Sequence, residues 1–335
     1  MPKLDRVRAG IVGYGPRFTM GLHHANYINA QDGMEVVAVC DLDEKQLEAA
    51  QEELPGIETY LDLATMLEEE DLDLAVVITP HNTHAKLAVQ CLQAGTHVIV
   101  EKPMCLNVDE ANEMIFAAEA NDVSLTVYHN RRLDADYLTI TEAVNQGLIG
   151  DIFEVEMFMG GWRPPQGWWR DDKKISGGAF YDWGAHMIDW VLQLIDRPII
   201  DVTGFFHKRV WEEKTNEDQV RAMIRFEDNV QADVTLSSIS HVPKPKWRIS
   251  GEKGGISEDW GDDAITVATE MEPLSPTMTI PLLDDAREKY YQNIAAHLME
   301  DEELAVRPEE AGRAIGVMEA AERSAKSGRP EKVGI

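Results

Sequence analysis

The chain contains little cysteine and no long apolar run. Its three cysteines, Cys40, Cys91 and Cys105, stand alone, without the even count of a disulfide framework or the close spacing of a zinc site. We therefore expect no metal site and a reducing compartment, the cytoplasm. No apolar run reaches the ~18 residues of a membrane span, and residues 1–8 lack the apolar core of an export signal. Neither export nor membrane insertion is predicted.

Basic residues are also scarce, with 31 Lys and Arg against 60 Asp and Glu and a formal net charge of −29. Such a surface repels phosphate backbones and anionic membranes, so we expect neither nucleic acid nor a membrane as a partner. We interpret the charge as a solvated surface, and adaptation to a salty environment is the less favoured alternative. With 44% apolar residues over 335 positions, the sequence predicts a soluble globular protein of two domains.

Up to residue 128, apolar segments alternate with amphipathic helical segments. The expected strands are 7–12, 34–40, 74–79, 97–100 and 124–128. The expected helices are 44–53, 61–69, 84–94 and 109–120, the last one capped by Asn107 and Glu110. This alternation predicts βαβ units and an α/β domain with a doubly wound parallel sheet over residues 1–128.

Residues 129–335 follow a different pattern. Helices are expected at 138–146, 179–194, 284–300 and 308–327, and strands at 152–159, 201–206, 220–226, 230–239 and 247–250. The short segment 227–229 predicts an antiparallel hairpin. The second domain is therefore expected to be α+β with a mostly antiparallel sheet, and no internal repeat is present.

A glycine turn follows the first strand. Gly13 and Gly15 suit a backbone that turns tightly against a pyrophosphate, so we expect cofactor contacts there and at the adjoining Pro16, Arg17 and Phe18. The pattern departs from the dinucleotide fingerprint, because Phe18 stands at the third glycine position. A simple tight turn is the alternative.

Asp41 ends the second strand. A carboxylate there can accept hydrogen bonds from both ribose hydroxyls of an adenosine and repels a 2′-phosphate, which favours NAD while leaving NADP possible. The alternative is that Asp41 only caps the next helix, although Asp43 could do that instead.

Polar residues follow two other strands of the first domain. Glu101-Lys102-Pro103 places a lysine at the carboxyl end of an apolar strand, where open α/β sheets bind ligands. Further cofactor contacts are expected from the segment that follows residues 74–79, at Thr79, Pro80, Asn82 and His84. For His84, capping or packing is the favoured alternative, and no third ligand supports a metal site with His81.

In the second domain, Asp182, His186, Asp189 and Gln193 fall on one stripe of an otherwise apolar predicted helix. An acid one turn from an imidazole suits general acid–base catalysis. The alternative is a core histidine. Upstream, a loop concentrates aromatic and basic side chains that either contact a sugar or form a subunit contact: Trp162, Arg163, Trp168, Trp169 and Arg170.

These motifs together resemble the Gfo/Idh/MocA family of oxidoreductases over nearly the whole chain. The resemblance rests on the glycine turn, Thr79-Pro80 with His84, Glu101-Lys102-Pro103, Asn130-Arg131-Arg132, and Gly177-Gly178 leading to Asp182 and His186.

The resemblance implies a Rossmann domain followed by a substrate-binding domain with a large open sheet, through which a homodimer or homotetramer forms. It implies hydride exchange between NAD(P) and a secondary alcohol or ketone carbon of a sugar or cyclitol. Lys102, Asp182 and His186 match the catalytic residues, with Glu101 and Lys102 also at the cofactor. The expected substrate-binding residues are Asn130, Arg131, Trp162, Arg163, Trp168, Trp169, Asp182 and His186.

Two alternative functions use the same parts. Bound NAD could oxidise a sugar transiently, allow an elimination or hydrolysis, and be reduced again without release. Less favoured is a regulator that senses NAD(P) and has lost the chemistry.

Overall fold

A computed structural model describes residues 4–15, 19–165 and 167–334 of the chain. The chain divides into two compact units. The first unit comprises Met1–His129 and Glu288–Gly312, and the second comprises Asn130–Arg287 and Arg313–Ile335. The sequence predicted a single domain boundary, after residue 128. In the structure, residues Glu288–Gly312 return to the first unit.

The return is held by contacts with the last strand of the first sheet. The hydroxyl of Tyr290 donates to the carbonyl of Val127 at 3.1 Å, and the hydroxyl of Thr126 donates to the carbonyl of Val306 at 2.7 Å. An amphipathic helical pattern predicts a helix but does not tell which sheet it covers.

Within the described part of the first unit, six parallel strands form one sheet in the order β3-β2-β1-β4-β5-β6. The strands are β1 (Val7–Val12), β2 (Met34–Cys40), β3 (Glu58–Tyr60), β4 (Leu74–Val77), β5 (His97–Val100) and β6 (Leu125–Val127). The order turns back between β1 and β4, which is the switch point where doubly wound sheets bind ligands. The predicted parallel α/β sheet is confirmed.

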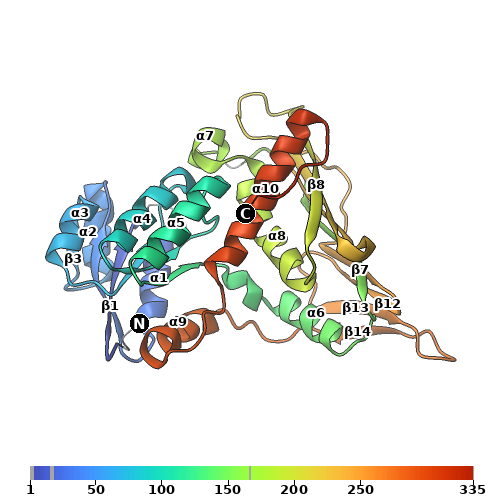
Figure 1. Ribbon diagram of the computed structural model, residues 1–335, viewed down its shortest axis with the longest axis horizontal. Helices are drawn as coiled ribbons and strands as arrows, with labels where there is room; N and C mark the ends of the chain where they lie inside the picture. Colours follow the sequence, from blue (N-terminus) through green and yellow to red (C-terminus); the bar gives the residue numbers. More distant parts are fainter. Residues whose placement is uncertain (1–3, 16–18, 166, 335) are drawn as a thin grey trace. The chain divides into compact units, whose positions relative to one another are not determined.

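The helices of this unit accompany the sheet, and α4 and α5 lie side by side (Figure 1). They are α1 (Met20–Asn29), α2 (Glu44–Glu53), α3 (Leu63–Glu69), the 3-10 turn η1 (His81–Thr83), α4 (His84–Gln93), α5 (Val108–Ala120) and α9 (Lys289–Glu300). The expected cap of α5 is present, because Asn107 accepts from the backbone N–H of Glu110 at 2.9 Å. Strand β3 and helix α1 were not predicted.

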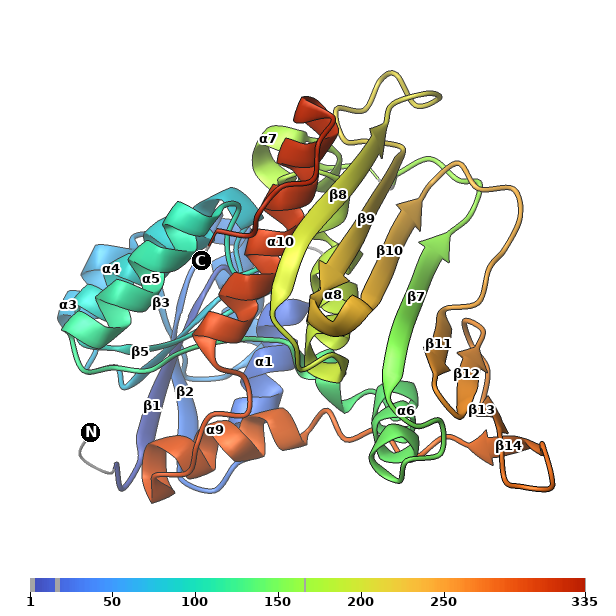
Figure 2. The same ribbon diagram turned by 45° about the vertical axis from the view of Figure 1, so that its right-hand side comes forward.

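The second unit contains a sheet of eight described strands in the order β14-β13-β12-β11-β7-β10-β9-β8 (Figure 2). They are β7 (Ile152–Gly160), β8 (Ile199–His207), β9 (Gln219–Phe226), β10 (Gln231–Ser237), β11 (Trp247–Gly251), β12 (Gly254–Glu258), β13 (Ala264–Thr269) and β14 (Thr277–Pro281). Only the β7–β10 pair is parallel. The mostly antiparallel sheet is confirmed, while β12, β13 and β14 were not predicted.

The remaining elements of this unit are helical. They are η2 (Asn130–Leu133), α6 (Ala135–Asn145), η3 (Trp169–Asp171), α7 (Lys173–Ser176), η4 (Ala179–Tyr181), α8 (Trp183–Leu194), the hairpin turn η5 (Glu227–Asn229) and, from Arg313 onward, α10 (Pro308–Ser327). Helix α10 contacts β8, where the hydroxyl of Ser324 accepts from the N–H of Gly204 at 3.0 Å. The η5 turn joins β9 to β10, and Asp228 and Asn229 there have φ of 57° and 60°. Asp and Asn tolerate this left-handed region, so the predicted hairpin is confirmed.

The helix expected at 179–194 is interrupted. Asp182 has φ −88° and ψ −92°, and it separates η4 from α8. The expected four-residue stripe therefore begins before the regular helix does. None of the described helices is long and apolar enough to cross a bilayer.

Candidate active site

The glycine turn connects β1 to α1 at the switch point of the sheet. Gly13 has φ +90°, and a side chain there would lie 2.8 Å from the carbonyl oxygen of Ile78. Gly15 has φ +65°, and no atom of the described residues lies within 4 Å of the position that a Cβ would take, so these residues leave open space there. Gly21 performs the packing role of the missing third glycine, because a Cβ there would lie 2.5 Å from the ring of Tyr14. The expected phosphate contacts of Gly13 and Gly15 stay predictions.

Pro16, Arg17 and Phe18 lie outside the described residues, so their expected cofactor contacts stay predictions.

The carboxylate of Asp41 closes this turn. Its Oδ2 accepts from the backbone N–H groups of Tyr14 and Gly15 at 2.8 and 3.2 Å. The cap of α2 is Asp43, which accepts from Lys45 N–H at 3.0 Å, so the cap does not need Asp41. A carboxylate beside the open space at Gly15 fits the ribose of a dinucleotide.

Lys102 is half-buried and follows β5 in a turn that several hydrogen bonds hold in place. The N–H of Glu101 donates to the carbonyl of Val77 at 2.9 Å, and the N–H of Lys102 donates to Oε2 of Glu101 at 2.9 Å. The carbonyl of Pro103 lies 2.8 Å from Nδ1 of His84. The backbone that carries Lys102 is therefore fixed to β4 and to α4.

His84 is buried and places both ring nitrogens on carbonyl oxygens. Nε2 lies 2.8 Å from the carbonyl of Thr79, and Nδ1 lies on Pro103. Thr79 also accepts from the hydroxyl of Thr83 at 2.7 Å. Pro80 precedes η1, in which Asn82 is exposed. His84 joins the segment after β4 to the Lys102 turn, which agrees with the packing alternative. Cofactor contacts of Thr79, Pro80, Asn82 and His84 stay predictions.

Asp182 and His186 lie around the start of α8. His186 is 4% exposed, and its ring lies 5.7 Å from the ring of Trp183 and 6.3 Å from that of Trp190. Asp182 accepts from the guanidinium of Arg170 at 2.8 Å. Asp182, which was expected to act with His186, is therefore paired with Arg170 of the tryptophan-rich loop.

Asp189, the third residue of the predicted stripe, forms an ion pair within the second unit. Its two oxygens accept from Nε and Nη2 of Arg132 at 2.8 and 2.6 Å. The preceding residue, Arg131, lies over the ring of Trp183 at 4.5 Å and pairs with Asp134 at 2.7 Å. Asn130 begins the same η2 turn. These contacts bring η2 against the start of α8.

The tryptophan-rich loop separates into two parts. Trp162 stacks on His241, with ring centroids 3.9 Å apart, and the N–H of Arg163 donates to the carbonyl of Ser238. Further along, the ring of Trp169 lies 5.3 Å from Trp168 and 4.8 Å from the guanidinium of Arg170. Only the second part connects to Asp182 through an ion pair that the structure records.

Comparison with known proteins bears on both units. Residues 7–129 match the model of the oxidoreductase family with an NAD-binding Rossmann fold, and residues 137–257 match the GFO/IDH/MocA C-terminal domain. The chain belongs to the Gfo/Idh/MocA oxidoreductase family.

Individual relatives cover the chain to different extents. The scyllo-inositol 2-dehydrogenase (NADP(+)) IolW of Bacillus subtilis is 28% identical over 98% of this chain and 96% of its own. A glycosyl hydrolase family 109 protein of Shewanella pealeana is 31% identical over 47% of this chain and 36% of its own. The crystal structure of an NAD-binding protein from Listeria innocua superimposes with a TM-score of 0.87 at 28% identity, over 98% of both chains.

This Gfo/Idh/MocA protein is an NAD(P)-dependent oxidoreductase that acts on CH–OH groups, as the motifs predicted. The described residues include no group of three or more His, Cys, Asp or Glu side chains placed to hold a metal ion.

The second unit contains a buried charged cluster that was not predicted from the sequence. Lys246 is 5% exposed and pairs with Asp136, which also accepts from Trp247 Nε1 at 2.9 Å. The Lys246 ammonium lies 5.0 Å from the ring of Trp190 and 4.6 Å from that of Trp260. Nothing in the local sequence marks these residues as neighbours, because they come from α6, α8 and the start of β11.

Glu258 lies beside this cluster and is 3% exposed, with no recorded partner for its Oε2. Burial and the nearby acidic groups of Asp136, Asp262 and Asp259 raise its pKa to about 8, and Lys246 opposes the rise. Because the folded-state pKa exceeds the ordinary value of 4.5, the folded protein binds the proton more tightly than the unfolded chain. This stabilisation is complete below pH 4.5 and is lost as the pH rises through 8.

Replacing Glu258 with Gln is therefore expected to flatten the pH dependence of stability. Between pH 5 and pH 8 the wild type loses up to about 1.4 kcal/mol per pH unit through this group, and the variant does not. Thermal unfolding at a series of pH values measures the difference. Glu252→Gln, at an exposed position of the same unit whose charge is not among those that raise the pKa of Glu258, is the control and keeps the wild-type slope. A wild-type slope in Glu258→Gln would contradict the assignment.

Proposed function

We propose that this enzyme exchanges a hydride between NAD(P) and a secondary alcohol or ketone carbon of a neutral sugar or cyclitol. The observation that carries the proposal is the Lys102 turn at the carboxyl end of β5, fixed through Glu101 and His84. A lysine held in that position donates a hydrogen bond to the oxygen of a carbinol or carbonyl. The name of the relative IolW supports a cyclitol as the substrate class.

A neutral substrate is supported by the partners of the arginines around α8. Arg131 pairs with Asp134, Arg132 with Asp189, and Arg170 with Asp182. A guanidinium that already binds a carboxylate gains little from an anionic ligand, because the two acids compete. Exposed aromatic faces at Trp162 and Trp168, which are 48% and 42% exposed, suit the C–H faces of a polyol ring.

In the proposed mechanism, His186 accepts the hydroxyl proton during oxidation and returns it during reduction. Lys102 stabilises negative charge that develops on a substrate oxygen. Asp182 orients His186, and Arg170 holds Asp182 in place. When bound, the nicotinamide takes up or supplies the hydride.

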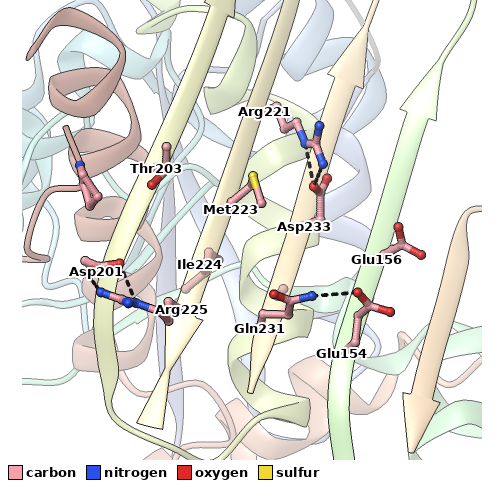
Figure 3. A pocket seen from close by; sticks show the side chains of 12 residues that line it. Glu154, Glu156, Asp201, Thr203, Arg221, Met223, Ile224, Arg225, Gln231 and Asp233 are labelled. Carbon is pink, nitrogen blue, oxygen red and sulfur yellow. Dashed lines mark hydrogen bonds and ion pairs between the residues drawn. The ribbon is translucent and has the colours of Figure 1, made fainter. Parts of the chain in front are cut away.

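Two further proposals concern the cofactor and the assembly. Asp41 supports NAD over NADP, because its carboxylate repels a 2′-phosphate, although the relative IolW is named for NADP(+). The expected homo-oligomer stays a prediction, and we propose the open face of the large sheet as its surface. Figure 3 shows the cross-strand pairs on this face, Arg221 with Asp233 and Arg225 with Asp201. Met223 and Phe205 on the same face are 40% and 43% exposed.

The function is tested by absorbance at 340 nm with NAD or NADP and a panel of myo-inositol, scyllo-inositol, glucose and xylose. We expect reduced cofactor with at least one polyol and a preference for NAD. No absorbance change with any of the polyols would contradict the proposal.

A second candidate is the redox cycle that ends in elimination or hydrolysis. The similarity of 47% of the chain to the glycosyl hydrolase family 109 protein favours it. Under this alternative a glycoside is cleaved with catalytic NAD and without accumulation of free NADH. Release of p-nitrophenol from nitrophenyl glycosides at constant absorbance at 340 nm would support it.

A further inference from the structure

Glu101 is engaged on both carboxylate oxygens inside the first unit. Its side chain is 13% exposed. Oε2 accepts from the backbone N–H of Lys102 at 2.9 Å, and Oε1 lies 3.2 Å from Nε2 of His24 on α1. The carboxylate therefore connects α1 to the backbone from which the Lys102 side chain begins.

His24 is fully buried behind this carboxylate. Its ring lies 4.4 Å from the ring of Tyr128, and its Nδ1 lies 2.5 Å from the hydroxyl of Tyr291 on α9. Figure 1 shows α9 close to α1, although Tyr291 follows His24 by 267 residues. A chain of contacts thus runs from Tyr291 through His24 and Glu101 to Lys102.

The burial of Tyr291 determines which group donates each hydrogen bond of this network. The side chain is fully buried, and burial raises the pKa of its hydroxyl well above the ordinary value, so the hydroxyl keeps its proton. A neutral imidazole donates from one nitrogen and accepts at the other. When Tyr291 donates to Nδ1, the ring proton is on Nε2, which faces Glu101.

The charge of Glu101 depends on this arrangement. Burial opposes its ionisation, but the hydrogen bond from His24 and the positive charges of Lys102 and His84 hold its pKa below the ordinary value. The other ionisable side chains packed against His24 and Tyr291 are those of His23, Tyr27, Tyr128 and Tyr290 among the described residues. Glu101 therefore keeps its negative charge next to the backbone N–H of Lys102.

We propose that His24 and Tyr291 are positioning residues for Lys102. Tyr291 fixes the tautomer of His24, His24 holds the carboxylate of Glu101, and Glu101 holds the turn and supplies the negative charge beside Lys102. The catalytic importance of this network rests on the proposed function of Lys102, but its effect on Lys102 can be measured without turnover.

The test follows the ¹³C-methyl signal of Lys102 at a fixed pH in the full-length protein. Lysines are methylated reductively with ¹³C-formaldehyde, and the Lys102 signal is assigned by its loss in Lys102→Met. We expect Tyr291→Phe and His24→Leu to move this signal away from its wild-type chemical shift, because the carboxylate that holds the Lys102 turn is no longer secured. His24→Gln retains a donor toward Glu101 and is expected to bring the signal most of the way back.

Tyr290→Phe is the matched control. Tyr290 is the neighbouring buried tyrosine, and its hydroxyl donates to the carbonyl of Val127 rather than to His24. We expect the wild-type Lys102 signal in this variant. If His24→Leu does not fold, Tyr291→Phe, which removes a single oxygen atom, still decides the question.

An unchanged Lys102 methyl signal in folded Tyr291→Phe would overturn the inference, as would an equal change of this signal in Tyr290→Phe. Neither result depends on finding a substrate. Failure of the polyol panel would count against the proposed function and leave the positioning network standing. If turnover is found, Tyr291→Phe is also expected to lower kcat with little change in KM, and Tyr290→Phe is not.

Discussion

Replacing Lys102 with Met is expected to lower kcat/KM by about 10³-fold or more while the affinity for NADH stays within a few-fold of the wild type. The variant loses the donor that stabilises charge on the substrate oxygen, and such donors contribute factors of roughly 10²–10³ in kcat. Loss of the nearby positive charge adds to this effect. Steady-state rates and NADH fluorescence titration measure the two quantities separately.

The matched control for this variant is Lys86→Met. Lys86 is exposed on α4 of the same unit and belongs to none of the contacts around the Lys102 turn. It is expected to keep the wild-type rate. A Lys102→Met enzyme with more than a tenth of the wild-type rate would remove Lys102 from the mechanism.

Replacing His186 with Gln is expected to lower kcat by roughly 10²–10⁴-fold, because the variant has no group that titrates near neutral pH to exchange the hydroxyl proton. The limb of the pH–rate profile that reports the base is expected to disappear. Gln fills a similar volume between Trp183 and Trp190, so the fold is expected to persist. Rates measured from pH 5 to pH 9, with circular dichroism as the folding check, give the result.

His241→Gln serves as the comparison for His186→Gln. His241 is exposed and stacks on Trp162, and it has no assigned part in proton transfer. Its pH profile is expected to match the wild type. A His186→Gln profile that keeps the wild-type limb, at any rate, would assign the proton to another group.

Elements with a strong local pattern could be predicted from the sequence. Strands Val7–Val12 and Met34–Cys40 and helix Pro308–Ser327 have the expected bounds, because each carries a clear apolar periodicity and a defined end. Short strands such as Glu58–Tyr60 and edge strands such as Thr277–Pro281 were missed. They carry few buried side chains, so their pairing depends on neighbours that are distant in sequence.

The helix around Asp182 shows a different limit. The spacing of Asp182 and His186 suits one face of a helix, but the chain bends at Asp182, where Arg170 holds its carboxylate. Local spacing cannot include such a partner, because Arg170 reaches Asp182 from the preceding loop. The pairing of Asp189 with Arg132 was hidden for the same reason.

The candidate site was predicted where local sequence marks the end of a strand. Lys102 lies just after one apolar strand, and Asp41 lies just after another, so their positions at the edge of the sheet could be predicted from the sequence. The residues that hold them were not. His24, Tyr291 and Glu258 gain their roles through tertiary contacts, and a histidine or tyrosine in an ordinary helix gives no local signal of such a contact.

Hydride exchange between a polyol carbon and NAD(P) leaves an isotopic label on the cofactor. The enzyme is incubated with NAD and a polyol of the panel that is deuterated at its carbinol carbons, and the free cofactor is analysed by mass spectrometry. We expect NADH that carries one deuterium and accumulates in step with the oxidised polyol. Free NADH without deuterium, or no reduced cofactor with any polyol, would contradict it.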